Sequence, residues 1–239
     1  MSKTVVVFGA GTGLGSAVAR RFGREGYRVA LVARNRERLD RLAAVLSAEG
    51  IEAEGFPADL TRTADVPELI ARIRDRFGRI DVIEYAPITT EGFTPAAELD
   101  AAGMRRHLDL FLLTPIEIVR AVLPELLERG DGAILLGQGV SATHPMPGLS
   151  GLGPAMAAAR NYLQSLHSEV EDRGVYVGAV HVAAMVLGSA GHTAMTDGEL
   201  ASGIDVSQIP QIDPADIAEA LWDIYAKRDR FEVQVPEFG

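Results

Sequence analysis

The sequence contains no cysteine, and lysine occurs only at Lys3 and Lys227. Without cysteine the chain can form no disulfide, no thiolate metal site and no cysteine nucleophile, and this composition is compatible with a cytoplasmic protein. No apolar run approaches the roughly 18 residues that a membrane-spanning helix needs, so we expect no membrane span. The first residues lead directly into a strand pattern, and we expect no signal peptide. The five histidines show no metal-ligand spacing, so we expect no metal site.

Positive charge is also scarce. The 239 residues carry 23 Lys and Arg against 33 Asp and Glu, a formal net charge of −10. A surface this acidic repels phosphate backbones, so nucleic-acid binding is not expected. Hydrophobic residues make up 47% and charged residues 23% of the chain, as in ordinary globular proteins. We expect one domain spanning residues 1–239.

Short apolar runs alternate with helical patterns along the whole chain, which is typical of βαβ units and a parallel sheet. We expect strands at residues 4–8, 28–32, 51–56, 80–85, 133–136, 175–181 and 231–235. We expect helices near residues 14–22, 36–48, 66–77, 104–129 and 154–172 and one that begins at Pro214. The predicted fold is α/β, a single doubly wound parallel sheet of about seven strands with helices on both faces. Ligands in such folds bind at the carboxyl ends of the strands.

A glycine-rich loop follows the first predicted strand and opens the first predicted helix. Glycines allow a tight turn and a close approach of backbone to a diphosphate, and the free N–H groups of the helix attract its negative charge. A strand before the loop and a helix after it are the context that a dinucleotide site requires. The residues expected at this site are Gly9, Gly11, Thr12, Gly13, Leu14 and Gly15.

The end of the second predicted strand indicates which dinucleotide binds. An NAD site usually has an acidic residue there, whereas this chain has Arg34, Asn35 and Arg36. A guanidinium suits a 2′-phosphate, so NADP(H) is favoured over NAD(H). A solvated helix face is the alternative reading of the same arginines. After the third strand, Asp59 and Leu60 are expected near the adenine, although Asp59 could equally cap a helix.

The sequence resembles the short-chain dehydrogenase/reductase superfamily over nearly its whole length. The resemblance rests on the spaced glycines of the loop, on Ala58-Asp59-Leu60, on Leu123-Pro124 before Gly132-Ala133-Ile134, and on Arg160-Asn161-Tyr162-Leu163. It implies a Rossmann fold, NAD(P)-dependent oxidation or reduction of a small molecule, and cofactor contacts from Ala86 and Pro87. It also implies a homo-oligomer, a dimer or tetramer, with the helices at 104–129 and 154–172 in the interface. The segment at about 187–211 occupies the position of the family's substrate loop.

The family's catalytic Ser, Tyr, Lys and Asn do not carry over. In ungapped counting their positions hold Gly139, Leu152, Met156 and Phe111, all non-polar. Neither lysine lies where it could replace the family's lysine. We therefore expect a degenerate catalytic site, and a missing general acid lowers the rate by about 10²- to 10⁴-fold.

Three other residues are candidates for the lost polar groups. Tyr85 ends the fourth strand and is our first choice for a relocated proton donor, whereas strand alternation points its neighbour Glu84 to the opposite face. Gln138 could donate a hydrogen bond to a carbonyl, and His144 could be a proton donor. An atypical NADP(H)-dependent oxidoreductase acting on a small hydrophobic substrate is the favoured function. A non-redox enzyme (cyclase, isomerase or dehydratase) and a non-catalytic nucleotide-binding sensor or partner subunit remain alternatives.

Overall fold

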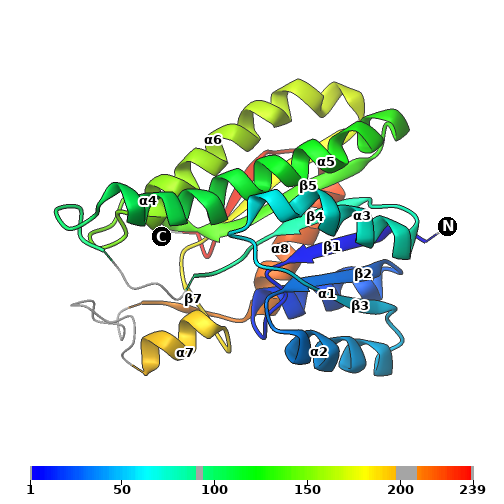
Figure 1. Cartoon of the computed structure of the whole chain (residues 1–239), viewed down its shortest axis with the longest axis horizontal. Helices are drawn as coiled ribbons and strands as arrows, with labels where there is room; N and C mark the ends of the chain where they lie inside the picture. Colours follow the sequence, from blue (N-terminus) through cyan, green and yellow to red (C-terminus); the bar gives the residue numbers. More distant parts are fainter. Residues whose placement is uncertain (1, 90–93, 198–208, 238–239) are drawn as a thin grey trace.

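The computed structural model of the chain describes residues 2–89, 94–197 and 209–237 (Figure 1). Within these ranges a sheet of seven strands, all parallel, has the order β3-β2-β1-β4-β5-β6-β9. The strands are β1 (Thr4–Phe8), β2 (Arg28–Ala33), β3 (Ala53–Pro57), β4 (Val82–Tyr85), β5 (Gly132–Gly139), β6 (Val175–Val182) and β9 (Glu232–Val235). The predicted α/β fold is confirmed, with strand boundaries that shift by up to three residues.

Helices cover both faces of the sheet. The main helices are α1 (Leu14–Arg24), α2 (Arg36–Ala48), α3 (Val66–Phe77), α4 (Ala101–Leu108), α5 (Thr114–Arg129), α6 (Leu152–Val170) and α8 (Pro214–Lys227). One core cluster joins α3, α5 and α6 to the sheet, and the other joins α1, α2 and α8 to its opposite face (Figure 1). Every residue of β1 is buried, because Val6 and Phe8 enter the first cluster while Val5 and Val7 enter the second. A strand covered on both faces must be apolar throughout, as this one is.

The strand register brings the carboxyl ends of the strands to one edge of the sheet. Phe8 of β1 lies opposite Tyr85 of β4, which in turn lies opposite Leu136 of β5. Further along, Gln138 of β5 pairs with His181 of β6. The polar residues predicted at separate strand ends therefore share one edge.

The long helix predicted at 104–129 is divided. α4 ends at Leu108, a π-helical turn spans Asp109–Leu113, and α5 begins at Thr114. Pro115 lies in the first turn of α5, where its missing N–H is tolerated, while Pro124 lies inside the helix. The π-turn adds one residue to a helical turn and so allows the chain to continue into α5 with a proline at its start.

Short elements between β6 and α8 escaped sequence prediction. β7 (Met185–Val186) and β8 (Gln211–Ile212) form a separate parallel pair, and α7 (Ala190–Thr196) follows β7. Two-residue strands carry no periodic signal. The expected substrate loop at 187–211 begins directly after β7, contains α7 and ends at the first residue of β8, and its residues 198–208 lie outside the described residues.

The first and last helices pack against each other through an aromatic cluster. The rings of Phe22 and Trp222 lie 5.0 Å apart, and the hydroxyls of Tyr27 and Tyr225 share a 2.6 Å hydrogen bond. Arg21 stacks over Trp222 with its guanidinium carbon 4.4 Å from the ring centroid. Among the described helices none is long and apolar enough to cross a membrane.

Candidate functional site: the dinucleotide loop and a buried polar edge

The glycine loop passes very close to the end of β4. Gly9 has a φ of +93°, and a Cβ placed on it would lie 2.7 Å from the Cα of Pro87 and 2.8 Å from the carbonyl oxygen of Ala86. Both contacts are with backbone, which cannot move aside. The structure therefore brings together Gly9, Ala86 and Pro87, which the sequence assigned to the same cofactor site.

The N-terminus of α1 has the features of an anion site. Gly13 is the N-cap and supplies no side-chain hydrogen bond, and the first turn contains no acidic residue. Gly11 and Thr12 are exposed, while Gly15 packs against the backbone of Gly9 and Ala10. Free N–H groups at a helix end favour a phosphate. These residues fit the diphosphate of a bound dinucleotide.

The segment after β7 contacts this loop from outside. The hydroxyl of Thr12 donates a 2.7 Å hydrogen bond to the carbonyl oxygen of Gly188. A Cβ on Gly13 would lie 2.8 Å from the Cβ of Ser189. The start of the expected substrate loop thus lies directly on the dinucleotide loop.

Arg34 and Arg36 follow β2 as the sequence indicates, and both are exposed. Asn35 is the N-cap of α2, where its side chain accepts a 3.0 Å hydrogen bond from the N–H of Arg38. Arg36 reaches back toward the carbonyl of Gly55 and lies 3.8 Å from Asp40. The guanidinium of Arg34 has no hydrogen bond or ion pair among the described residues, so it is available to a ligand.

Asp59 lies close enough to Arg34 to respond to its charge. A hydrogen bond from the N–H of Thr61, assisted by the Thr61 hydroxyl and by Arg34, lowers the pKa of Asp59. Asp59 thus closes a local turn before the helix rather than capping it. Its neighbour Leu60 is buried.

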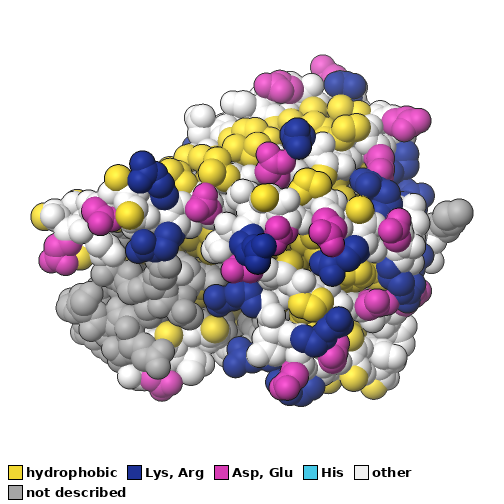
Figure 2. All heavy atoms as spheres, viewed as in Figure 1, with side chains coloured by type: hydrophobic (Ala, Val, Ile, Leu, Met, Phe, Trp, Pro, Cys, Tyr) yellow, Lys and Arg dark blue, Asp and Glu magenta, His cyan; other side chains and the backbone are white. Residues whose placement is uncertain are grey.

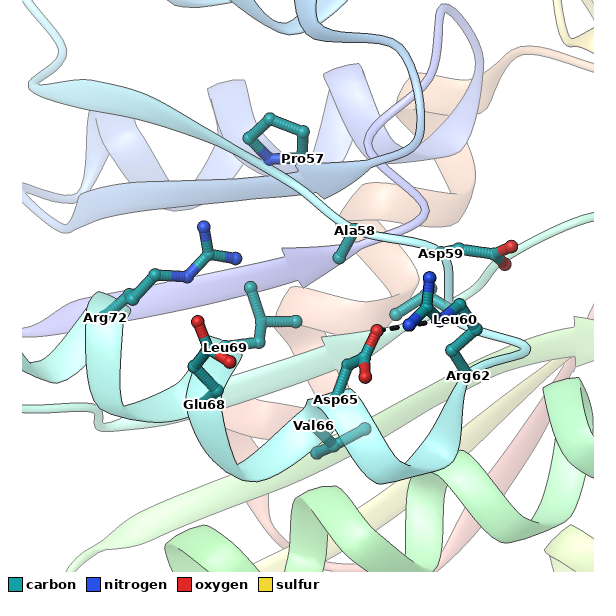
Figure 3. A pocket seen from close by; sticks show the side chains of 10 residues that line it. All are labelled: Pro57, Ala58, Asp59, Leu60, Arg62, Asp65, Val66, Glu68, Leu69 and Arg72. Carbon is teal, nitrogen blue, oxygen red and sulfur yellow. Dashed lines mark ion pairs between the residues drawn. The ribbon is translucent and has the colours of Figure 1, made fainter.

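A pocket of about 270 Å³ opens beside this turn, between the end of β3 and the start of α3 (Figure 3). Arg62 and Asp65 form an ion pair at its rim, with 2.9 Å between Nε and Oδ2. Figure 3 shows the Asp59 carboxylate pointing away from the other lining side chains. The pocket lies at the expected adenine end of the sheet edge, away from β5 and β6.

The structure places the four non-polar residues that the ungapped count assigned to the family's catalytic positions in two different surroundings. A Cβ on Gly139 would lie 3.8 Å from the sulfur of Met156, which also receives a 3.8 Å contact from the Ser141 hydroxyl. Leu152, the first residue of α6, packs against the core. Phe111 is buried in the π-turn, with its ring 6.4 Å from that of His107. Gly139 and Met156 are thus neighbours, while Phe111 belongs to the core.

Tyr85 lies inside the core. It is 3% exposed, and its hydroxyl donates a hydrogen bond to the carbonyl oxygen of Leu110 in the π-turn. Burial raises its pKa well above 10. A phenol with these contacts is a weak candidate for a proton donor to a ligand, and Tyr85 instead holds the π-turn against the sheet.

Gln138 and His144 differ in their surroundings. Gln138 is buried at the end of β5, with its side-chain nitrogen 3.5 Å from Nδ1 of His181. His144 is exposed, and its Nδ1 lies 2.9 Å from the Thr143 hydroxyl. Of these two residues and Tyr85, we favour Gln138, which directly precedes Gly139 in β5, while the Ser141 hydroxyl lies 3.6 Å from a Cβ placed on Gly139.

Glu84 has no hydrogen-bond partner within the described part of the chain, although it is completely buried. Its carboxylate lies beneath the dinucleotide loop, because a Cβ on Gly137 would be 3.5 Å from its Oε1 and 3.2 Å from the side chain of Leu14. Burial raises the pKa of Glu84 to about 8. The predicted orientation opposite to Tyr85 is confirmed, but the burial of an unpaired carboxyl was not foreseen.

A partly buried ionic cluster was also missed by sequence reasoning. His181 Nε2 lies 2.9 Å from Glu232 Oε2, and the same oxygen accepts a 2.6 Å hydrogen bond from Nε of Arg160. The sequence does contain a signal for this cluster, because the polar residues Gln138 and His181 lie near the ends of the otherwise apolar strands β5 and β6. Glu232 and Arg160 lie far away in sequence and gave no sign of a shared site.

Comparison with known proteins agrees with this geometry. Residues 3–197 match the model of the short chain dehydrogenase family. The chain belongs to that family. An uncharacterized oxidoreductase of Staphylococcus epidermidis is 26% identical over 238 residues, which cover 98% of this chain and 95% of the relative. The family predicted from the glycine loop is therefore confirmed.

Two solved structures illustrate the family's range. A short-chain dehydrogenase from Sphingobium yanoikuyae in complex with NADPH has a TM-score of 0.80 and 29% identity over 99% of this chain and 89% of that one. A 7α-hydroxysteroid dehydrogenase complexed with NADH has a TM-score of 0.83 at 19% identity, covering 98% and 92%. The shared fold thus accommodates either dinucleotide.

Replacing Gly9 by alanine should destabilise the protein strongly, whereas Gly11→Ala should not. The added methyl at Gly9 meets backbone and requires a left-handed φ, so we expect a loss of about 2 kcal/mol or more. A Cβ on Gly11 makes only an ordinary 3.7 Å contact, and we expect a change within about 0.5 kcal/mol. Urea unfolding of both variants tests this, and equal stabilities would contradict it.

The free energy of unfolding of the native protein should fall as pH rises, and Glu84→Gln should abolish this fall. The unfolded chain releases the Glu84 proton near pH 4.5, but the folded protein retains it to about pH 8. Folding therefore binds a proton in this window, and the stability of the native protein falls between the two values. Unfolding free energies from pH 5 to about 8.5 should show the variant gaining on the native protein by several kcal/mol.

Glu128→Gln, a change of an exposed carboxylate on α5, is the control for Glu84→Gln and should leave the slope unchanged. Parallel pH dependences for the native protein and Glu84→Gln would show that Glu84 is already ionised or solvated.

Proposed function

We propose that this short-chain dehydrogenase is an NADP(H)-dependent oxidoreductase that acts on a small, apolar carbonyl or alcohol without the family's Ser-Tyr-Lys acid–base set. The observation that carries the proposal is the contrast between the two halves of the sheet edge. The dinucleotide half keeps its loop, its bare helix N-terminus and its exposed arginine. The other half has Gly139 and Met156 side by side where polar groups are expected.

The choice of NADP(H) rests on Arg34. Its guanidinium is exposed at the end of β2 and has no hydrogen bond or ion pair among the described residues. The neighbouring Asn35 is occupied as a helix cap, so it cannot replace an acidic residue on the ribose. A planar cation without a carboxylate beside it suits a 2′-phosphate.

Bound NADPH would supply the hydride, solvent would supply the proton, and the residues of this chain would bind and orient the substrate. Leu152 and Met156 give the substrate side an apolar wall, and Met156 cannot donate a proton. Gln138 is the polar side chain at the end of β5 next to Gly139, so we assign it the substrate oxygen. A neutral amide polarises a carbonyl less than an ionisable group does, so slow chemistry is expected.

The same proposal includes self-association through α5 and α6. Figure 2 shows a band of hydrophobic side chains across the region where these two helices lie. Leu113, at the junction with α5, is 41% exposed. An exposed apolar band of this kind is typical of an interface between subunits.

A single domain and a cytoplasmic location remain predictions from the sequence.

Arg34→Ser should weaken NADPH binding about 10- to 100-fold, the range expected for a lost charge-assisted hydrogen bond. NADH binding should change little, because NADH has no 2′-phosphate. Calorimetric titration with both cofactors measures this. Arg38→Ser, which removes an exposed arginine from the first turn of α2, is the matched control and should retain the preference.

Native protein that binds NADH as tightly as NADPH would contradict the assignment. An equal loss of NADPH affinity in Arg34→Ser and Arg38→Ser would mean that only the general positive charge of this region matters for binding.

NADPH fluorescence should change on binding, while aldehydes and ketones, acetophenone among them, are reduced slowly. We expect rates about 10²- to 10⁴-fold below those of family members with a tyrosine acid. Gln138→Leu should abolish the residual oxidation of NADPH at 340 nm without changing NADPH affinity. Gln164→Leu, an exposed position on α6, should leave both unchanged.

NADPH binding with no consumption of any carbonyl would favour the non-redox or sensor alternatives and would overturn the proposed function. Fast turnover that survives Gln138→Leu, Tyr85→Phe and His144→Ala would show that another residue donates the proton.

A further inference from the structure

Four polar side chains from four elements form a chain beneath the end of β5. Arg160 of α6 donates to both oxygens of Glu232 of β9, at 2.6 and 2.5 Å. Glu232 in turn lies 2.9 Å from Nε2 of His181 on β6. The other ring nitrogen of His181 lies 3.5 Å from the side-chain nitrogen of Gln138. The proposed function uses only Gln138, the last member.

The charges in this chain of four side chains determine which ring nitrogen of His181 carries the hydrogen. The Arg160 hydrogen bonds lower the pKa of Glu232, so Glu232 is a carboxylate and can only accept. His181 must therefore present an N–H at Nε2. In a neutral ring this leaves the lone pair at Nδ1, which accepts from the amide of Gln138.

Burial increases along the chain toward the candidate site. The side chains of Arg160 and Glu232 are 27% and 30% exposed, whereas His181 and Gln138 are 3% and 6% exposed. Gln138 is followed at once by Gly139, which lies beside Met156. The chain thus runs from a partly solvated ion pair to the residue assigned to the substrate oxygen.

We propose that Arg160, Glu232 and His181 are positioning residues that orient the amide of Gln138, and that protonation of His181 reverses this amide. This inference rests on the proposed function, because it takes Gln138 as the contact for the substrate oxygen. With neutral His181 the Gln138 nitrogen faces the ring, and the amide oxygen is free to accept from an alcohol. With protonated His181, Nδ1–H requires an acceptor, so the Gln138 oxygen turns to the ring and the NH₂ group can donate to a carbonyl.

The charged groups that face His181 come from three segments. Glu232 of β9 favours the protonated ring, while Arg160 of α6 and His144 of the loop after β5 oppose it. Burial is the largest influence and lowers the pKa of His181. Its β5 neighbour Gln138 cannot titrate. The switch therefore operates on the acid side of neutrality.

Two complexes that cannot react test the switch. Acetophenone is titrated into protein saturated with NADP⁺, and 1-phenylethanol into protein saturated with NADPH, at about pH 5.5 and about pH 8. Binding is followed by NMR through the ¹⁵N–¹H signals of the Gln138 amide. The ratio of the affinity for the ketone to the affinity for the alcohol should be about fivefold higher at the lower pH. A change of this size corresponds to exchanging one hydrogen bond.

His181→Asn keeps a polar side chain but cannot titrate, so the pH dependence of this ratio should vanish. Glu232→Gln should shift the dependence to lower pH, because the ring loses its negative partner. His167→Asn is the matched control and should leave the ratio unchanged, since His167 of α6 also pairs with a glutamate, Glu171, which directly follows that helix (3.2 Å).

A second readout needs no ligand. ¹⁵N chemical shifts of the histidine rings should show neutral His181 with its hydrogen on Nε2, and Glu232→Gln should weaken this preference. The opposite tautomer, a ratio that is independent of pH in the native protein, an unchanged dependence in His181→Asn, or Gln138 signals that neither compound perturbs would each overturn the inference. NADPH consumption on the carbonyl panel decides the proposed function separately.

Discussion

The architecture of the dinucleotide site depends on one steric constraint, the approach of Gly9 to the end of β4. Parallel pairing of Phe8 with Tyr85 makes the chain segments after β1 and β4 emerge side by side. Only a residue without a Cβ leaves room for both. This contact sets the path of the glycine loop and therefore the direction in which the N-terminus of α1 points. The exposed Arg34 and the turn at Asp59 are then brought to the same edge by the register of β2 and β3.

The fold and the dinucleotide half could be predicted from the sequence because their signals are local. A buried strand, a glycine loop and a helix follow one another within about 20 residues, and their order alone specifies the geometry. The polar half could not be predicted in this way. His181 forms a hydrogen bond with Glu232, which lies 51 residues further along the sequence. The choice of Tyr85 as a proton donor did not take into account that the π-turn places the carbonyl of Leu110 against the Tyr85 hydroxyl. Periodicity shows which face a residue occupies, but not which partner the tertiary structure brings to it.

Two of the buried polar features, Glu84 and the chain ending at Gln138, share a position at the carboxyl edge of the sheet. Buried polar groups weaken a core unless they are fully satisfied, and those without structural benefit are expected at functional sites. Glu84 lies on the α1 face beneath the dinucleotide loop, and His181 lies on the α6 face beneath the substrate side. The sheet thus separates two titratable groups, one for each half of the site.

The aromatic cluster between α1 and α8 makes the protein its own fluorescent reporter. Trp222 is the single tryptophan, and it lies on the last helix against Phe22 of the first. The helix that carries the dinucleotide loop is therefore covered only when nearly the whole chain is present. During synthesis this half of the molecule cannot be completed until residues 214–227 have left the ribosome. Emission from Trp222 reports the moment at which the two ends of the chain meet.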